Sequence, residues 1–509
     1  MKYLLGIDLG TSGTKTVIFT QDGKPVASAT EEYPLHQPQN GWAEQHPEDW
    51  WKAAQNTVSR VLEASDIDPG DIAGIGISGQ MHGLVMLDKD GNVLRPAILW
   101  CDGRTIEECN EITEIIGKKR LIEISANPAL PGFTAGKILW VRKHEPEIWA
   151  KCAHIMLPKD YVRFKLTGTY ATEVSDASGT NLLDVANRCW SDEILEKLNI
   201  DKSILPKVYE SADVVGYVTY EAAKATGLKA GTLVVGGAGD NAAAAVGTGV
   251  VKEGNAFISI GTSGVIFAHS NKVSIDPEGR VHTFCAAVPN GWTVMSCTLA
   301  AGLSLKWFRD NFCDAEIQKA KEQNVDPYYL MDKEAEKVPI GANRLIYLPY
   351  LMGERSPILD SNSRGVFFGL SAIHGKYDML RAVMEGVVYS QRHCLDVLRE
   401  MNVYPEDIIA TGGGGSSPLW RQMIADNFGF PVKTSTNKEG PVLGAALLAG
   451  VGAGLYKSVE EACETAIRTN PPQQPIAENS KKYDKVYAIY KGLYGQLKQS
   501  FSELAELDK

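Results

Sequence analysis

The chain has 509 residues, a length that corresponds to roughly two to four domains. Its apolar and charged fractions, 44% and 22%, are ordinary for a globular protein. The 51 basic and 62 acidic side chains give a net charge of −11, and no dense lysine or arginine run is present. This balance argues against nucleic acid or an anionic membrane as the main partner.

The nine cysteines are scattered along the sequence without any CxxC pair. Such a pattern is typical of reduced thiols and not of a disulfide framework or a zinc site. The apolar stretch after Lys2 is interrupted by Asp8 and is too short for the core of a signal peptide. The glycine-rich stretch around Asp240 and Asn241 is too polar to span a membrane. We therefore expect a cytoplasmic location.

The N-terminal stretch IDLGTSGTK predicts a buried strand over residues 3–8, a turn over 10–13 and a second strand over 16–20. A glycine-rich turn with hydroxyl groups can hold phosphate oxygens, and Asp8 beside it can hold a metal ion. The simpler alternative is a plain β-hairpin with a solvated aspartate.

Strand and helix patterns then alternate along the first half. We expect a strand over 24–33, a helix over 47–64 and a strand over 72–77 that ends in SGQMHG. A second hairpin is expected through Asp90-Gly91, and a buried strand over 233–237 leads into GAGDNAAAAVG. His82 can donate to a hydroxyl, although a lone histidine is more often structural. Asp102 and Arg104 can equally pair within the fold.

The second half opens with a strand from Ala256 and a second GTSG turn at 261–264. This repeat of the first turn suggests two related domains. Towards the end we expect a strand over 408–411, a glycine loop over 412–415 and a helix over 419–428. The last element is an amphipathic helix packed on the body of the protein. Its apolar residues are Tyr483, Val486, Tyr490, Leu493, Leu497, Phe501 and Leu504.

Asp8 and Asp240 both end apolar strands among small residues. Phosphoryl transfer to an alcohol needs a magnesium ion on the donor phosphates and a carboxylate that takes the hydroxyl proton, so each acid can serve one role. The alternative is that each merely caps a turn or a helix. The spacing of the glycines fits neither a P-loop nor a dinucleotide-binding fingerprint.

Ordered motifs along most of the chain carry a family resemblance. They are GIDLGTSGTK, GISGQMHG, LWCDGRT, GFTAGKILWVRKH, GAGDNAAAAVGTG, SIGTSG, LPYLMGERSPILDSNSRGVFFGL and GGGGSSPLWRQMIADNFGFPV. The chain resembles the FGGY carbohydrate kinases, and most of all those that act on D-xylulose. The resemblance implies an α/β, actin/Hsp70-like ATPase fold with two ribonuclease-H-like domains around a central cleft.

The resemblance also implies a domain division and a set of site residues. Residues 1–248 would form the sugar-binding domain, 249–470 the ATP-binding domain and 471–509 the terminal helix. Asp240 would be the general base and Asp8 would organise Mg²⁺, while domain closure aligns the sugar with ATP. Met81, His82 and Asn241 would join Asp240 at the sugar. The residues implied at ATP are Thr11, Ser12, Lys15, Thr262, Gly302, Lys306, Gly413, Gly414 and Ser417.

The Met81-His82 pair, followed by Gly83, implies D-xylulose as the acceptor. Glycerol kinases carry an Arg-Glu pair at this place, and gluconokinases usually have serine after Met-His. Cys101 departs from the family pattern, in which asparagine is often found, so another sugar such as D-ribulose or gluconate stays open. A non-sugar ATPase of the actin/Hsp70 class is a further alternative. Dimers are common in the family, so a homodimer is also an expectation.

Overall fold

The computed structural model describes residues 2–507, whose internal contacts divide the chain into two compact units. The first unit contains Met1–Lys252, His269–Thr293 and Asn437–Arg468. The second contains Glu253–Ala268, Val294–Thr436 and Thr469–Lys509. Among the helices of residues 2–507, none combines the length and the apolar character that crossing a bilayer requires.

A seven-stranded sheet forms the centre of the first unit. Its order is β13 (Val214–Tyr217), β14 (Leu233–Val235), β5 (Ile72–Gly79), β1 (Tyr3–Leu9), β2 (Gly13–Thr20) and β3 (Pro25–Glu32), with β15 (Ala238–Gly239) also paired to β5. β1, β2 and β3 form an antiparallel meander, whereas β5 runs parallel to β1 and to β15. The N-terminal hairpin and the strand over 72–77 that the sequence predicts are therefore confirmed, with β5 two residues longer.

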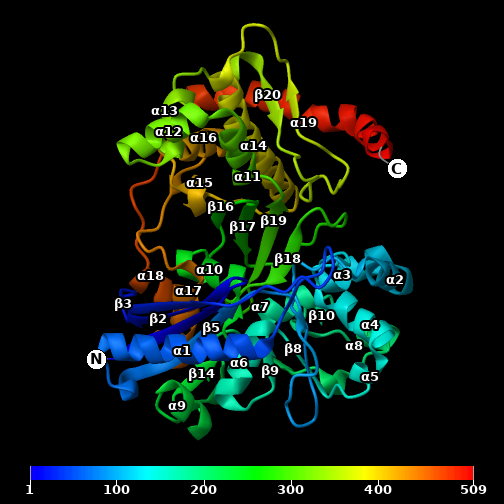
Figure 1. Cartoon of the computed structure of the whole chain (residues 1–509), viewed down its shortest axis with the longest axis vertical. Coiled ribbons are helices and arrows are strands. Elements are labelled where there is room, and N and C mark those ends of the chain that lie inside the picture. Colours follow the sequence, from blue (N-terminus) through cyan, green and yellow to red (C-terminus); the bar gives the residue numbers. More distant parts are fainter. Residues whose placement is uncertain (1, 508–509) are drawn as a thin grey trace. The chain divides into compact units, whose positions relative to one another are not determined.

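Alternating side chains give this sheet two apolar faces. On one face Leu5 and Ile7 pack with Trp50 and Val58 of α1 (Pro47–Ser65), which Figure 1 shows running along the sheet. The other face packs against α10 (Asp240–Thr248) and α17 (Gly440–Gly452). A Cβ atom on Gly76 would lie 1.8 Å from the carbonyl oxygen of Ala445, so glycine allows α17 to approach the sheet.

Shorter strands and helices complete the first unit. The strand pairs are β4 (Glu44–Gln45) with β7 (Ala97–Ile98), β6 (Val85–Leu87) with β8 (His154–Met156), β9 (Ala171–Glu173) with β12 (Lys207–Tyr209), and β10 (Leu183–Asp184) with β11 (Cys189–Trp190). The helices are α2 (Ile106–Ile116), α3 (Lys118–Ser125), α4 (Thr134–His144), α5 (Pro146–Trp149), α6 (Pro158–Thr167), α7 (Val174–Ala177), α8 (Asp192–Lys197), α9 (Tyr220–Thr226) and α18 (Val459–Ala466), and β18 (His282–Cys285) is a further strand.

The second unit repeats the arrangement of a hairpin beside a parallel strand. Its sheet runs β19 (Trp292–Thr298), β17 (Gly264–Ser270), β16 (Asn255–Ile260), β22 (Asp407–Thr411) and β23 (Val432–Lys433). β16 and β17 are antiparallel and β22 is parallel to β16, as β1, β2 and β5 are in the first unit. Each GTSG turn therefore joins the first two strands of an equivalent three-stranded arrangement.

Helices pack around the sheet of the second unit. They are α11 (Gly302–Phe312), α12 (Asp314–Gln323), α13 (Pro327–Ala335), α14 (Lys376–Glu400), α15 (Gly412–Gly415), α16 (Pro418–Phe428) and α19 (Ala477–Glu506), with a small ribbon of β20 (Ile346–Leu348) and β21 (Val366–Phe368). Figure 1 shows the long α14 among α11, α16 and β20. The indole nitrogen of Trp420 in α16 donates to the carbonyl oxygen of Met384 in α14 over 3.0 Å, which fixes these two helices together.

The structure corrects one local prediction and refines two others. Residues 412–415 form the short helix α15 and not a loop, since glycine lets this turn pack against Ile260 and Trp420. The hairpin through Asp90-Gly91 is confirmed as a short one: Leu87 of β6 forms an antiparallel bridge with Val93, and the Leu94 nitrogen donates to the Met86 carbonyl oxygen over 3.0 Å. The terminal amphipathic helix is confirmed as α19, although Leu504 is 54% exposed.

Candidate functional site

Asp8 lies near the end of β1, held between two neighbouring strands. In the sheet register it faces Lys15 of β2 and Ser78 of β5. The Ser78 hydroxyl donates to a carboxylate oxygen of Asp8 over 2.8 Å. Burial raises the pKa of Asp8, while the Ser78 hydrogen bond and the Lys15 charge oppose that shift. The aspartate is therefore not the solvated hairpin residue of the simpler alternative.

The turn after Asp8 is closed by a hydrogen bond of 3.0 Å from the Gly10 nitrogen to the Gly13 carbonyl oxygen. The Thr11 hydroxyl accepts from the Trp100 indole over 2.9 Å and donates to the Gln80 amide over 3.3 Å. Trp100 and Gln80 therefore position this turn, and neither was singled out from the sequence.

Two further residues of the hairpin have different surroundings. Ser12 is exposed at the tip of the turn. Lys15 makes an ion pair with Glu439, the residue that precedes α17. Glu439 also acts on Asp8, because its charge raises the pKa of that carboxyl. Since Glu439 lies more than 400 residues along the chain, its place here could not be read from the sequence.

Asp240 is the first residue of α10 and directly follows β15. Ala238 of β15 lies beside Ser78 of β5, and Asp8 lies beside the same serine from β1, so the two aspartates occur at the same end of the two strands that flank β5. Burial, together with the charge of Asp8, raises the pKa of Asp240 to about 7. The Asn241 main-chain and side-chain nitrogens donate to one oxygen of Asp240 over 2.7 and 3.0 Å.

Glycines leave room for Met81 and for His82, and Met81 packs against Gly239, the residue before Asp240. A Cβ atom on Gly239 would lie 2.8 Å from the Cγ of Met81, and one on Gly179 would lie 2.4 Å from the His82 ring. The Nδ1 atom of His82 is 2.8 Å from the carbonyl oxygen of Gly179. The structure therefore brings Met81, Asp240 and Asn241 together with Asp8, while the ring of His82, the next residue after Met81, lies against Gly179 and Phe133.

Asp102 and Arg104 have a structural role. The Arg104 guanidinium donates to the Asp102 carboxylate over 2.7 Å and lies over the ring of Trp42, 3.7 Å from its centroid. The Asp102 carboxylate also accepts from the Ala43 nitrogen over 2.6 Å. Asp102 and Arg104 therefore pair with each other inside the first unit, which is the alternative expected for them from the sequence.

A pocket of about 540 Å³ in the second unit brings together six predicted ATP-binding residues. These are Thr262, Gly302, Lys306, Gly413, Gly414 and Ser417. They come from the end of β16, the start of α11 and the α15–α16 connection. A pocket of this volume matches the usual size of a small-molecule or cofactor site. The Lys306 amine lies 2.8 Å from Asp310, one turn further along α11.

Glycines shape this pocket because they let neighbouring chain segments approach each other closely. A Cβ atom on Gly302 would lie 2.3 Å from the carbonyl oxygen of Gly261, which accepts the Gly302 N–H over 2.8 Å. A Cβ atom on Gly414 would lie 2.5 Å from the side chain of Ile260. A Cβ atom on Gly413 would meet no atom within 4 Å, so this position leaves the pocket wall open.

One wall of the pocket was not predicted. It comes from α13 and its N-cap, which contribute Asp326, Tyr328, Tyr329 and Asp332. The pKa of Asp332 is raised by burial, and a hydrogen bond from Ser417 opposes the shift. The sequence DPYY marks a helix start, because Asp326 accepts from the Tyr328 nitrogen and Pro327 takes the first helical position. Nothing in the sequence indicates which pocket that helix lines.

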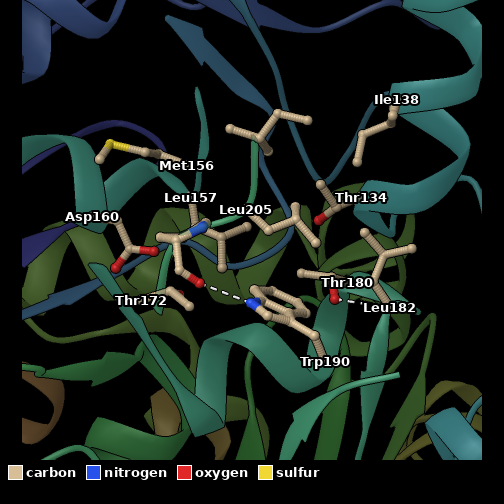
Figure 2. A pocket seen from close by; sticks show the side chains of 12 residues that line it. Thr134, Ile138, Met156, Leu157, Asp160, Thr172, Thr180, Leu182, Trp190 and Leu205 are labelled. Atoms are coloured by element: carbon tan, nitrogen blue, oxygen red, sulfur yellow. Dashed lines mark hydrogen bonds between the residues drawn. The ribbon is translucent and has the colours of Figure 1, made fainter. Parts of the chain in front are cut away.

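A second cavity, in the first unit, is too small for a ligand. Its volume is about 10 Å³, space for at most one water molecule. Figure 2 shows apolar side chains around it, among them Ile138, Met156 and Leu205, with Thr134 at its edge. The Trp190 indole donates to the carbonyl oxygen of Pro206 over 2.8 Å along its wall. This cavity is a packing defect and not a binding site.

Comparison with known proteins supports a specific family. Residues 3–247 match the model of the N-terminal domain of the FGGY family of carbohydrate kinases, and residues 256–453 match that of its C-terminal domain. A curated relative named xylulose kinase, from Bacillus subtilis, is 42% identical over 509 residues and 100% of both chains. Another, named gluconokinase and from the same organism, is 31% identical over 100% of this chain and 98% of its own.

Solved structures agree with the sequence comparison. The crystal structure of a xylulose kinase from Rhodospirillum rubrum superposes with a TM-score of 0.91 at 29% identity, over 98% of this chain and 100% of the other. The actin/Hsp70-like α/β fold expected from the sequence is thereby confirmed. With both family models matched over most of its length, this chain belongs to the FGGY family of carbohydrate kinases.

Proposed function

We propose that this kinase transfers the terminal phosphoryl group of ATP to a terminal hydroxyl of D-xylulose, giving D-xylulose 5-phosphate and ADP. The observation that carries the proposal is the packing of Met81 against Gly239, directly beside Asp240. A carboxylate and the residues expected at the sugar thus share one place in the first unit. The relative named xylulose kinase, identical at 42% of positions over the whole chain, supports the same acceptor.

Asp240 is the proposed general base. The Asp240 carboxylate would accept the proton of the attacking hydroxyl. Asn241 would orient that carboxylate, because its main-chain and side-chain nitrogens both donate to Asp240 Oδ1. A pKa of about 7 suits this role, because a base works best when its pKa lies near the working pH. Met81 and His82 would contact the sugar and orient that hydroxyl towards Asp240.

ATP is the proposed occupant of the second-unit pocket. Gly302, Gly413 and Gly414 leave room for the nucleoside, and Thr262 follows β16 where a phosphate would be held. Lys306 and Ser417 would complete this side of the site. Thr11, Ser12 and Lys15 of the first-unit hairpin would lie near the transferred phosphate. Domain closure, with residues 1–248 on the sugar and 249–470 on ATP, is part of the proposal.

Mg²⁺ is the proposed metal, held by Asp8 and the phosphates of ATP. Within residues 2–507 no group of three or more His, Cys, Asp or Glu side chains is arranged for a metal. Asp8 is half-buried, and its charge raises the pKa of the half-buried Asp240. A carboxylate in this position fits a cation that takes one or two carboxylates and completes its shell with phosphates and water. When bound, Mg²⁺ neutralises charge on the phosphates.

Gluconate is the second candidate acceptor. The relative named gluconokinase covers the whole chain at 31% identity, and the Met-His pair is expected in that branch as well. D-ribulose also stays open, because Cys101 is exposed beside Trp100 and departs from the usual residue. Membership in a carbohydrate kinase family argues against the non-sugar ATPase. The cytoplasmic location and the homodimer stay predictions.

The test is the Asp240→Asn variant, assayed for ADP release with D-xylulose and ATP–Mg²⁺. Loss of the base should lower kcat by about two to four orders of magnitude with the fold intact. Asp192→Asn is the matched control, since Asp192 is also the first residue of a helix and its side chain is 82% exposed. Activity of Asp240→Asn within tenfold of wild type would mean that another group is the base.

A further inference from the structure

We propose that Lys137 is a positioning residue that fixes the main chain at His82 and thereby sets the affinity for the sugar. The inference rests on the proposed function, because it takes Met81-His82 as the sugar-contacting pair. Lys137 is the fourth residue of α4, in its first turn, and is completely buried. Since the catalytic scheme above makes no use of this side chain, its burial calls for a separate explanation.

The Lys137 amine joins two chain segments through their carbonyl groups. Its Nζ donates to the carbonyl oxygen of His82 over 2.8 Å and to that of Gly132 over 2.7 Å. The Thr134 hydroxyl donates to the same His82 oxygen over 3.1 Å. The residue after Gly132 is Phe133, whose ring lies against the His82 ring with centroids 4.5 Å apart. One amine therefore hydrogen-bonds both chain segments that carry the packed rings of His82 and Phe133.

His82 needs such support because of its backbone conformation. Its φ angle is +69°, a left-handed value that costs free energy for a residue with a side chain. Such conformations persist where the surroundings fix them, and they concentrate at functional sites. Two donors on the His82 carbonyl and the contact of Nδ1 with Gly179 hold the residue from both its main chain and its ring.

A purely structural role would not require a lysine here. A buried amine must give up its hydration, and methionine would fill a similar volume without that cost. Burial lowers the pKa of Lys137 to about 7, against the attraction of the Asp102 carboxylate. A neutral or a charged amine can donate to two carbonyl groups, so the hydrogen bonds do not depend on its protonation. What lysine provides and methionine cannot is the pair of hydrogen bonds that fix the carbonyl groups of His82 and Gly132.

The experiment compares Lys137→Met with wild type in steady-state kinetics and in amide hydrogen exchange of the segment around His82. We expect the KM for D-xylulose to rise about tenfold while kcat and the KM for ATP change less than about twofold. Exchange at residues 80–86 should become faster. Lys119→Met is the matched control, with the same substitution in α3, where the Lys119 side chain is 89% exposed.

Thr134→Val provides a second test that does not depend on folding of the lysine variant. It removes only the weaker donor to His82, so the KM for D-xylulose should rise about two- to threefold, again without a change in the KM for ATP. An unchanged sugar KM in either folded variant would overturn the inference. So would an equal rise for sugar and ATP, since that indicates general loosening.

The two proposals fail in different ways. If wild type does not phosphorylate D-xylulose, the proposed acceptor is wrong, and the Lys137→Met comparison is made with the sugar that wild type accepts. If wild type uses D-xylulose and Lys137→Met shows no selective loss of sugar affinity, only the role of Lys137 is wrong.

Discussion

Asp8 and Asp240 lie at the same end of β1 and β15, the two strands that pair with the end of β5. Asp8 and Asp240 are both largely enclosed, and the charge of Asp8 raises the pKa of Asp240. Such a pair is costly in an apoprotein, because like charges in a low-dielectric site repel each other. The same pair is favourable where a cation and a proton-donating hydroxyl are bound, which is the situation that phosphoryl transfer creates.

Asp8→Asn should therefore weaken the response to Mg²⁺ more than the response to sugar. The change removes the proposed ligand charge, so we expect the Mg²⁺ concentration for half-maximal activity to rise about 10–100-fold. A Mg²⁺ titration at saturating ATP and sugar measures this. Asp22→Asn, on the exposed turn between β2 and β3, is the control. An unchanged Mg²⁺ requirement in Asp8→Asn would contradict the assignment.

Glu354 in the second unit is a buried acid with an incomplete set of partners. Its Oε1 accepts from the Leu299 and Arg355 nitrogens, each over 2.8 Å, whereas its Oε2 is buried without a hydrogen bond. Burial raises the pKa of Glu354 to about 8, against a usual value of 4.5. The folded state therefore keeps a proton that the unfolded state loses, and stability falls as the pH rises from about 4.5 to 8.

Glu354→Gln should remove this pH dependence, because glutamine stays neutral. The difference in melting temperature, Glu354→Gln minus wild type, should become more positive by roughly 2 °C or more as the pH is raised from 5 to 8. Thermal unfolding at a series of pH values is the measurement. Glu322→Gln, an exposed site in α12, should follow wild type at every pH. A constant difference between Glu354→Gln and wild type would show that Glu354 is ionised in the folded protein.

Among the elements of the second unit, the shape of the pocket proposed for ATP depends on how closely the start of α11 approaches the turn after β16. Gly302 donates to Gly261, and Leu303 donates to Thr262 over 3.1 Å. A side chain at position 302 would collide with main-chain atoms, which cannot move aside as a flexible side chain does. The glycine therefore sets the relative position of two elements that line the pocket.

Gly302→Ala should raise the KM for ATP about tenfold, since its Cβ would lie 2.3 Å from the Gly261 carbonyl oxygen and displace the pocket wall. The KM for D-xylulose should change less than about twofold. Initial-rate kinetics with each substrate varied in turn give both values. Gly495→Ala in α19, where a Cβ atom meets nothing within 4 Å, is the control. A selective rise in the sugar KM instead would contradict the placement of ATP.

Elements built from local patterns were predictable, and those decided by distant packing were not. The strands around Asp8 and the helix α19 follow from apolar periodicity, and the structure confirms them. Residues 412–415 were expected to be a loop, because glycine usually disfavours helix, but packing on Ile260 and Trp420 overrides that preference. The Lys15–Glu439 pair and the contribution of α13 to the pocket depend on long-range folding, which leaves no local signal.

At the scale of the whole molecule, the same three-stranded arrangement occurs in both units, each time with a GTSG turn after its first strand. One unit carries the carboxylates and the Met-His pair, and the other carries the large pocket. This division matches a kinase that binds acceptor and donor on different parts of the chain. The domain limits 1–248, 249–470 and 471–509 stay a prediction of the resemblance.

ADP release from ATP–Mg²⁺ can be measured with D-xylulose, D-ribulose, L-ribulose, glycerol and gluconate, beside a control without sugar, and it shows directly which sugar this kinase phosphorylates. We predict strong, selective turnover with D-xylulose and little without sugar. Preference for gluconate or D-ribulose would keep the family and the base but contradict the reading of Met81-His82. ADP release that does not depend on any of these sugars would contradict the central claim that this chain phosphorylates a sugar of this kind.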